Sequence, residues 1–186
     1  MAADRAPLGS DPVVLLICGS TRRLSTNAAL LRALDASPPR GVECVLSDAL
    51  RRLPHFDPDD DRDPLPGAVA DLRASLSAAT AVLFCTPEYA GALPGSLKNL
   101  LDWTVGGTET QGLPAGWVNV APAPRGDGAH AELATVAAYT ELEVVPAACV
   151  RIPVPRDAVG PDGELLDYGA LVAAHDAVRA LLHRGR

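Results

Sequence analysis

Short apolar runs alternate along the chain with longer segments of helical periodicity, and this alternation predicts a sheet covered by helices. Apolar residues are continuous rather than alternating in the strongest runs, which is typical of strands buried on both faces. Helical segments are predicted from about residue 27 to the prolines at 38 and 39, over 67–79, from Pro94 to the glycines at 106 and 107, over 133–140, and after Asp167. The predicted strands are residues 13–18, 42–46, 81–85, 117–121 and 144–145, with an extension of the last through residue 152 left open.

Five strands that alternate with helices imply an α/β fold, a three-layer α/β/α sandwich around a five-stranded parallel sheet. Right-handed crossovers favour the strand order 2-1-3-4-5. In that order the switch point lies between strands one and three. The loops at residues 19–27 and 86–91 are therefore expected to flank a ligand crevice.

The loop after the first strand has the chemistry of an anion site. Residues 19–27 read Gly-Ser-Thr-Arg-Arg-Leu-Ser-Thr-Asn and lie between a strand and the start of a helix. A helix N-terminus offers unpaired N–H groups and a partial positive charge, hydroxyl groups add donors, and an arginine can pair with a phosphate. The alternative for this stretch alone is a polar turn with two solvated arginines.

The loop after the third strand is suited to a flat ring. Residues 86–95 read Thr-Pro-Glu-Tyr-Ala-Gly-Ala-Leu-Pro-Gly. A rigid proline, an aromatic side chain and a glycine allow backbone and an aromatic face to lie along a planar ligand. Taken alone, the stretch is better explained as an ordinary strand-to-helix connection.

Spacing excludes several better-known sites. After Gly19 no glycine follows before Gly41, so neither the dinucleotide fingerprint nor a P-loop is present. A tyrosine-phosphatase loop needs Cys, five residues, then Arg, but Leu24 stands in the sixth place after Cys18. The aspartates between 57 and 61 lack the glycine and glutamate of an EF-hand, and a solvated loop is predicted for residues 53–66.

Composition narrows the class of protein further. The chain has 186 residues and a formal net charge of -7, which argues against a nucleic-acid partner. No signal-peptide pattern or membrane-spanning run is present, so a cytoplasmic protein with no membrane partner is expected. One domain is predicted over residues 13–186, after a flexible N-terminal tail at 1–12.

Four isolated cysteines form no C-x-x-C pair and indicate small core residues rather than metal ligands.

Two motifs together resemble the NADPH-dependent FMN reductase family of flavodoxin-like proteins, which includes quinone, chromate and azo-dye reductases. Residues 19–27 resemble the family's phosphate loop, G-S-x-R-x-x-S-x-N. Residues 86–103 resemble its T-P-E-Y-N…P-G-x-L-K-N-x-x-D-W segment, with Ala90 in place of the usual Asn. Residues 53–59 are similar to a third recurrent family loop, whereas residues 121–126 depart from the family's Ser- and Gly-rich version.

The resemblance implies FMN as cofactor and NADPH or NADH as co-substrate. By it, the FMN phosphate is held by Ser20, Arg22, Ser25, Thr26 and Asn27, and the ring is lined by Pro87, Glu88, Tyr89, Ala90 and Gly91. No protein side chain is expected to act as a catalytic acid or base, since flavin carries the chemistry.

The expected function is ping-pong electron transfer from the nicotinamide to a quinone or another small electrophilic acceptor. The alternative is a flavodoxin-like electron carrier that never meets a nicotinamide. Family members form dimers or tetramers, so a homodimer or homotetramer is expected, with residues 89–103 as interface candidates. The sequence also predicts that Leu97, Leu100, Leu101 and Trp103 supply more apolar surface than one helix face buries within its own subunit.

Overall fold

The computed structural model describes residues 11–183, and the predicted parallel sheet is present in the predicted order, β2-β1-β3-β4-β5. Residues 1–10 of the expected tail lie outside the described part of the chain. The elements are β1 (Val13–Cys18), α1 (Thr26–Ala36), β2 (Glu43–Leu46), α2 (Gly67–Ala78), β3 (Ala81–Cys85), α3 (Gly95–Asp102), β4 (Pro114–Asn119), α4 (Asp127–Tyr139), β5 (Glu143–Arg151) and α5 (Tyr168–Leu182).

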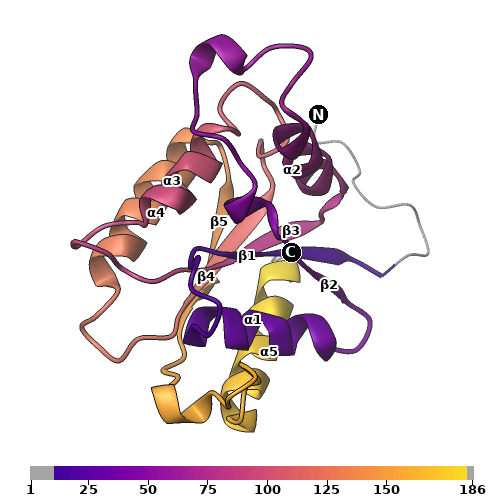
Figure 1. The fold of residues 1–186 in the computed structure, drawn as a ribbon. Coiled ribbons are helices and arrows are strands. Elements are labelled where there is room, and N and C mark those ends of the chain that lie inside the picture. Colours follow the sequence, from indigo (N-terminus) through magenta and orange to yellow (C-terminus); the bar gives the residue numbers. More distant parts are fainter. Residues whose placement is uncertain (1–10, 184–186) are drawn as a thin grey trace.

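Helices cover both faces of the sheet, as continuous apolar strands require. Helices α1 and α5 lie on one face, and α2, α3 and α4 lie on the other (Figure 1). Strand β3 is buried at every position, and it separates two apolar clusters, one on each face of the sheet. Among residues 11–183, no helix is both long enough and apolar enough to cross a membrane.

Two helix starts follow the predicted signals. Ser25 accepts a hydrogen bond from the N–H of Ala28 and begins α1, and Asp167 accepts one from Ala170 and begins α5. Both side chains satisfy N–H groups that have no partner within the helix.

Strand β4 and helix α4 both begin earlier than predicted. Strand β4 begins at Pro114 rather than Trp117 and ends at Asn119. Proline is tolerated at the first position of a strand, which allows Pro114 to begin β4. Gly116 packs closely against β5, because a Cβ there would lie 2.7 Å from the Cβ of Ala148. Packing therefore holds Pro114 and Gly116 in the strand, although both are weak strand formers. Helix α4 begins at Asp127, inside the segment predicted as a loop, because Gly126 adopts a φ of +85° just before it.

Most residues of the acidic segment 53–66 are exposed, as a solvated loop requires, but Asp61 at its centre is covered and departs from that prediction. The Asp61 carboxylate forms an ion pair with Arg73 at 2.6 Å, and the two side chains are only 9% and 11% exposed. Arg73 also donates to the carbonyl of Trp103. The segment therefore lies as a strap across the end of α3.

The apolar residues of α3 are buried within the subunit. Leu97, Leu100, Leu101 and Trp103 are each no more than 1% exposed, because the sheet and the strap cover them. The surplus apolar surface that was predicted for an oligomer interface is therefore absent from this helix. The oligomeric state itself stays a prediction.

Candidate functional site

An elongated cavity lies at the carboxyl edge of the sheet, where the loops after β1, β3 and β4 meet the segment that follows β5. It has two adjoining lobes of about 360 and 450 Å³, which share Thr26, Asn27, Pro87 and Arg156. We call the lobe that also contains Ser20, Arg22 and Ser25 the β1 lobe, and the one that also contains Asn119 to Pro122 and Arg125 the β4 lobe.

The β1 lobe presents hydrogen-bond donors around the start of α1. The N–H groups of Thr26 and Asn27, in the first turn, have no acceptor within the helix. The Ser20 hydroxyl accepts from the N–H of Arg22 at 3.2 Å, which folds the loop into a tight turn. The Arg22 guanidinium has no hydrogen-bond or ion-pair partner within residues 11–183. An anion placed here would meet N–H, hydroxyl and guanidinium groups together.

Close packing of β1 against β3 fixes the base of this lobe. A Cβ on Gly19 would collide with the Thr86 side chain, so glycine lets the two strand ends approach each other. The buried Asn27 amide oxygen accepts a hydrogen bond from the Cys85 thiol at 3.2 Å. Burial raises the pKa of the Cys18 thiol, which is the opposite of what a phosphatase nucleophile needs.

The loop after β3 is braced against α4. Glu88 accepts a hydrogen bond from the N–H of Ala129 at 3.2 Å, and Glu132 accepts one from Leu93 at 2.6 Å. Gly128 is required between them, since a Cβ there would collide with the carbonyl of Gly91. Glu88 thus lines the β4 lobe and also satisfies the N-terminus of α4.

The predicted ring-binding residues divide into two groups. Pro87 lines both lobes, Glu88 lines the β4 lobe, and Tyr89 lines the β1 lobe with 53% of its surface exposed. Ala90 and Gly91 line neither lobe. They are instead the two central residues of a tight turn between Tyr89 and Ala92, which exchange two backbone hydrogen bonds of 3.1 Å.

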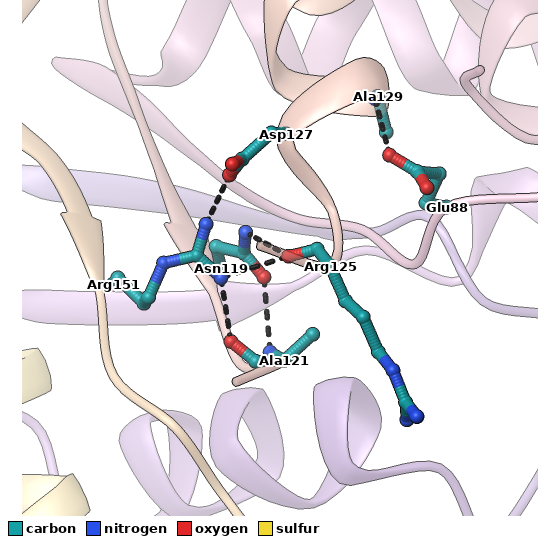
Figure 2. Close-up of polar contacts among 7 residues, drawn as sticks. All are labelled: Glu88, Asn119, Ala121, Arg125, Asp127, Ala129 and Arg151. Atoms are coloured by element: carbon teal, nitrogen blue, oxygen red, sulfur yellow. Dashed lines mark hydrogen bonds and ion pairs between the residues drawn. The ribbon is translucent and has the colours of Figure 1, made fainter. Parts of the chain in front are cut away.

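Two side chains hold the loop after β4 (Figure 2). The Asn119 amide donates to the carbonyl of Arg125 and accepts from the N–H of Ala121, both at 2.9 Å. Arg151, at the end of β5, donates to the carbonyls of Ala121 and Arg125 and pairs with Asp127. The Arg125 side chain points away from the other residues drawn in Figure 2 and lines the β4 lobe.

Sequence reasoning did not identify Asn119, Arg125 or Arg156 as site residues. Asn119 ends the fourth strand at the same sheet edge as Cys18 and Cys85, so its position in the topology was a usable signal. Arg156 lies on the non-periodic segment after β5, for which the pattern of the chain gives no placement.

The residues of the cavity fit FMN. The β1 lobe supplies a helix N-terminus, hydroxyls and a guanidinium for a phosphate. The β4 lobe is lined by prolines, valines and Ala121, with polar side chains that include Asn119, Glu88, Arg125 and Arg156, and a partly apolar lining with a few polar groups suits a flat heterocycle.

Comparison with known proteins is consistent with this geometry. Residues 12–155 match the family model of the NADPH-dependent FMN reductases. An NAD(P)H-dependent FMN reductase of Pseudomonas aeruginosa is 30% identical over 177 residues, which cover 94% of this chain and 95% of that protein. A quinone reductase of Escherichia coli is 32% identical over 91 residues, which cover 48% of each chain.

Among solved structures, the NAD(P)H:(acceptor) oxidoreductase FerB of Paracoccus denitrificans superposes with a TM-score of 0.77. The two chains are 27% identical, and the match covers 92% of this chain and 95% of FerB.

Proposed function

Because the chain belongs to the NADPH-dependent FMN reductase family, we propose that it uses bound FMN to oxidise NAD(P)H and reduce a quinone. The overall reaction takes NAD(P)H, a quinone and one proton to NAD(P)⁺ and the hydroquinone, with two electrons transferred. The predicted reductase is supported by relatives named FMN reductase and quinone reductase, and the alternative of an electron carrier is not favoured.

This proposal rests on the different linings of the two lobes of one cavity. One lobe offers a helix N-terminus, hydroxyls and a guanidinium, and the other offers a partly apolar lining. A ligand with a phosphate at one end and a planar ring at the other satisfies both ends.

We assign the phosphate to the β1 lobe and the ring to the β4 lobe. Ser20, Arg22, Ser25, Thr26 and Asn27 would hold the phosphate, since they or their backbone N–H groups line the β1 lobe. Pro87 and Asn119, which both line the β4 lobe, would contact the ring, and the half-exposed Tyr89 would approach it from the β1 lobe. Ala90 and Gly91 would act through the shape of their turn rather than by contact.

FMN, when bound, supplies the redox chemistry, and the protein supplies binding and orientation. Glu88, the acid that lines the cavity, already accepts a hydrogen bond from the N–H of Ala129, so its carboxylate is held against α4. Asn119 and Arg151 fix the loop after β4, so the floor beneath the ring is preorganised.

The direct experiment is to purify the protein with FMN and add NADPH or NADH without oxygen. We expect a yellow protein that bleaches with at least one nicotinamide and regains its colour when a quinone is added. A protein that binds FMN, fails to bleach with either nicotinamide and still passes electrons from chemically reduced flavin to a protein partner would favour the carrier instead.

The placement of the phosphate can be tested separately. Replacing Arg22 with alanine should weaken FMN binding about tenfold to a hundredfold, the range for one hydrogen bond to a charged group. The matched control is Arg23→Ala, because Arg23 is the next residue and lines neither lobe. Equal affinities of the two variants in a fluorescence titration of apoprotein would remove Arg22 from the phosphate site.

We also propose a homodimer or homotetramer. The support is the resemblance together with two exposed apolar side chains near the ends of α3 and α4, Val105 at 63% and Tyr139 at 85%. Light scattering at micromolar protein should give more than the monomer mass of 19.3 kDa. The physiological acceptor and a cytoplasmic location stay predictions.

A further inference from the structure

The loop after β4 presents an unpaired arginine where the sequence departs from the family motif. Residues 121–126 read Ala-Pro-Ala-Pro-Arg-Gly, in place of the Ser- and Gly-rich version that is usual in the family. Within residues 11–183 the Arg125 guanidinium makes no hydrogen bond or ion pair, and the residue lines the β4 lobe. This chain therefore places an unneutralised positive charge in the lobe to which we assign the flavin ring.

The backbone of Arg125 is fixed, and its side chain takes no part in fixing it (Figure 2). The carbonyl of Arg125 accepts a hydrogen bond of 2.9 Å from the Asn119 amide and one of 2.8 Å from Arg151. Arg151 also pairs with Asp127, so that carboxylate is already engaged. The Arg125 side chain extends away from this network, which leaves its guanidinium available to a bound ligand.

The acid that lines the cavity does not neutralise Arg125. Among residues 11–183, Glu88 is the one acidic residue that lines either lobe, and its carboxylate is held by the N–H of Ala129 at the start of α4. Arg22 lines the β1 lobe and Arg156 lines both lobes, so a phosphate in the β1 lobe can engage both. Arg125 is the arginine that lines the β4 lobe without lining the β1 lobe.

Reduction changes the charge of the ring in one direction. A hydride brings two electrons and one hydrogen nucleus, so the donor leaves as NAD(P)⁺ and the ring gains one negative charge. The quinone then takes both electrons, that hydrogen and one proton from solvent, and the ring returns to its neutral form. A cation beside the ring therefore interacts more favourably with the reduced form than with the oxidised form, whichever edge of the ring it faces.

We propose that Arg125 raises the reduction potential of bound FMN. This inference rests on the proposed function, since it requires FMN with its ring in the β4 lobe. A group that binds the reduced cofactor more tightly than the oxidised one raises the potential according to the ratio of the two affinities. Arg125 is an exposed residue, so water and salt screen its charge, and a ratio of about threefold to tenfold is expected.

The test measures the midpoint potential of bound FMN in the wild type and in Arg125→Lys, Arg125→Gln and Arg125→Glu. The titration uses a chemical reductant and a reference dye without oxygen, so it needs no nicotinamide. Arg125→Gln should lower the potential by about 15 to 30 mV, which corresponds to the threefold to tenfold ratio for a two-electron couple. Arg125→Glu should lower it further. Arg125→Lys should stay close to the wild type, because it keeps the charge and loses only the planar fork.

Further comparisons separate this effect from a general loosening of the site. Oxidised FMN should bind the wild type and Arg125→Gln equally well in a fluorescence titration. The affinity for reduced FMN, obtained from that value and the potential, should fall about threefold to tenfold in Arg125→Gln. Raised salt should lower the potential of the wild type more than that of Arg125→Gln. Arg40→Gln is the matched control, since Arg40 is also exposed and unpaired but lies on the turn before β2, and it should keep the wild-type potential.

Equal potentials in the wild type and the three Arg125 variants would overturn the proposal. So would a loss of affinity that is the same for oxidised and reduced FMN, because Arg125 would then contact the cofactor without distinguishing its redox forms. Potentials that do not follow the charge at position 125 would assign the effect to altered packing and overturn it as well. Failure of both nicotinamides to bleach the flavin, in a protein whose potentials do follow that charge, would contradict the proposed function alone.

Discussion

The backbone conformation at position 90 disfavours the Ala that this chain has in place of the Asn of the family motif. The turn at residues 89–92 has φ values of +53° at Ala90 and +78° at Gly91, which is the geometry of a type I′ turn. Asn-Gly is the preferred pair for such a turn, because Asn tolerates a positive φ far better than Ala does. An Asn at position 90 would therefore suit the backbone of this turn, whatever its side chain also contacted.

Ala90→Asn should stabilise the protein by about 0.5–1 kcal/mol, because it relieves the left-handed conformation of alanine. Urea unfolding of the apoprotein measures this gain. Ala92→Asn is the control, since Ala92 is in the same turn but is not at a positive φ, and it should give no gain. If FMN binding also tightens in Ala90→Asn, the side chain acts on the rim of the ring as well; if neither quantity changes, the turn explanation is wrong.

His130 gives the protein a defined sensitivity to acid. Burial against Trp117, followed by the charge of Arg151, lowers the pKa of His130 to about 4, although Asp127 and Glu88 oppose the shift. The imidazole Nε2 is buried and without a partner within residues 11–183. Since the unfolded chain has the ordinary histidine pKa of about 6.5, protons bind the unfolded state first as pH falls.

We therefore expect a contribution from His130 that is fully present above pH 6.5 and is lost as pH falls towards 4. His130→Phe keeps an aromatic ring against Trp117 and removes the titrating group, so its free energy of unfolding should fall less steeply over that interval. Unfolding curves of both proteins from pH 7 to 4 give the comparison. Parallel pH profiles would mean that His130 is accessible enough to charge in the folded state.

At the level of elements, Asn99 of α3 makes two of the hydrogen bonds that hold the strap at residues 53–66. The Asn99 amide accepts from the N–H of Phe56 and donates to the carbonyl of Pro54, both at 2.8 Å. Trp103 donates to the same carbonyl, and its ring meets Phe56 edge-on at 5.0 Å. A single amide thus satisfies two backbone groups of a segment that has little regular structure of its own.

Asn99→Ala should cost about 1–3 kcal/mol of stability, because it leaves the N–H of Phe56 without its partner. Chemical denaturation measures the loss, and limited proteolysis should report cleavage within 53–66. Lys98→Gln is the control on the same helix, since Lys98 makes only a partly exposed ion pair with Asp102 and should cost about 0.5 kcal/mol or less. A strap that stays protected in Asn99→Ala would show that Arg73 and Asp61 hold it alone.

The elements that were predicted correctly from the sequence are those whose bounds are set by neighbouring residues. Strands β1 and β3 were predicted to the residue, because burial on both faces leaves an unbroken apolar run. Helix α1 was predicted because Ser25 carries its start signal in its own side chain. The start of β4 depends on Gly116 packing against Ala148, and the strap depends on Asn99, so both are set by contacts between distant parts of the chain.

The same distinction applies to the cavity. Ser20, Arg22 and Asn27 belong to a contiguous motif next to a strand end, and their convergence was predictable from the topology. Arg156 lies at the cavity because the segment after β5 passes beside it. That segment has no helical or strand periodicity from which its position could be predicted. The Arg156 guanidinium adds positive charge to the lining of the cavity, and the pattern of the chain gave no indication of that.

For the molecule as a whole, one cavity has to serve both the electron donor and the acceptor. Its lobes share Thr26, Asn27, Pro87 and Arg156, so they form one space rather than two binding sites. With FMN in that space, we expect the donor and the quinone to meet the ring at the same exposed face. Two substrates that use one face of the ring have to bind in turn.

We therefore expect ping-pong kinetics, with parallel lines in double-reciprocal plots of rate against NADPH at several quinone concentrations. Excess quinone should inhibit competitively with NADPH, because it occupies the oxidised enzyme in the donor's place. Stopped-flow mixing with NADPH alone should reduce the flavin fully within one turnover time, since no acceptor needs to be present for that half-reaction. Intersecting lines, or flavin reduction that requires bound quinone, would show that both substrates occupy the protein together. The donor would then have to bind outside the two lobes.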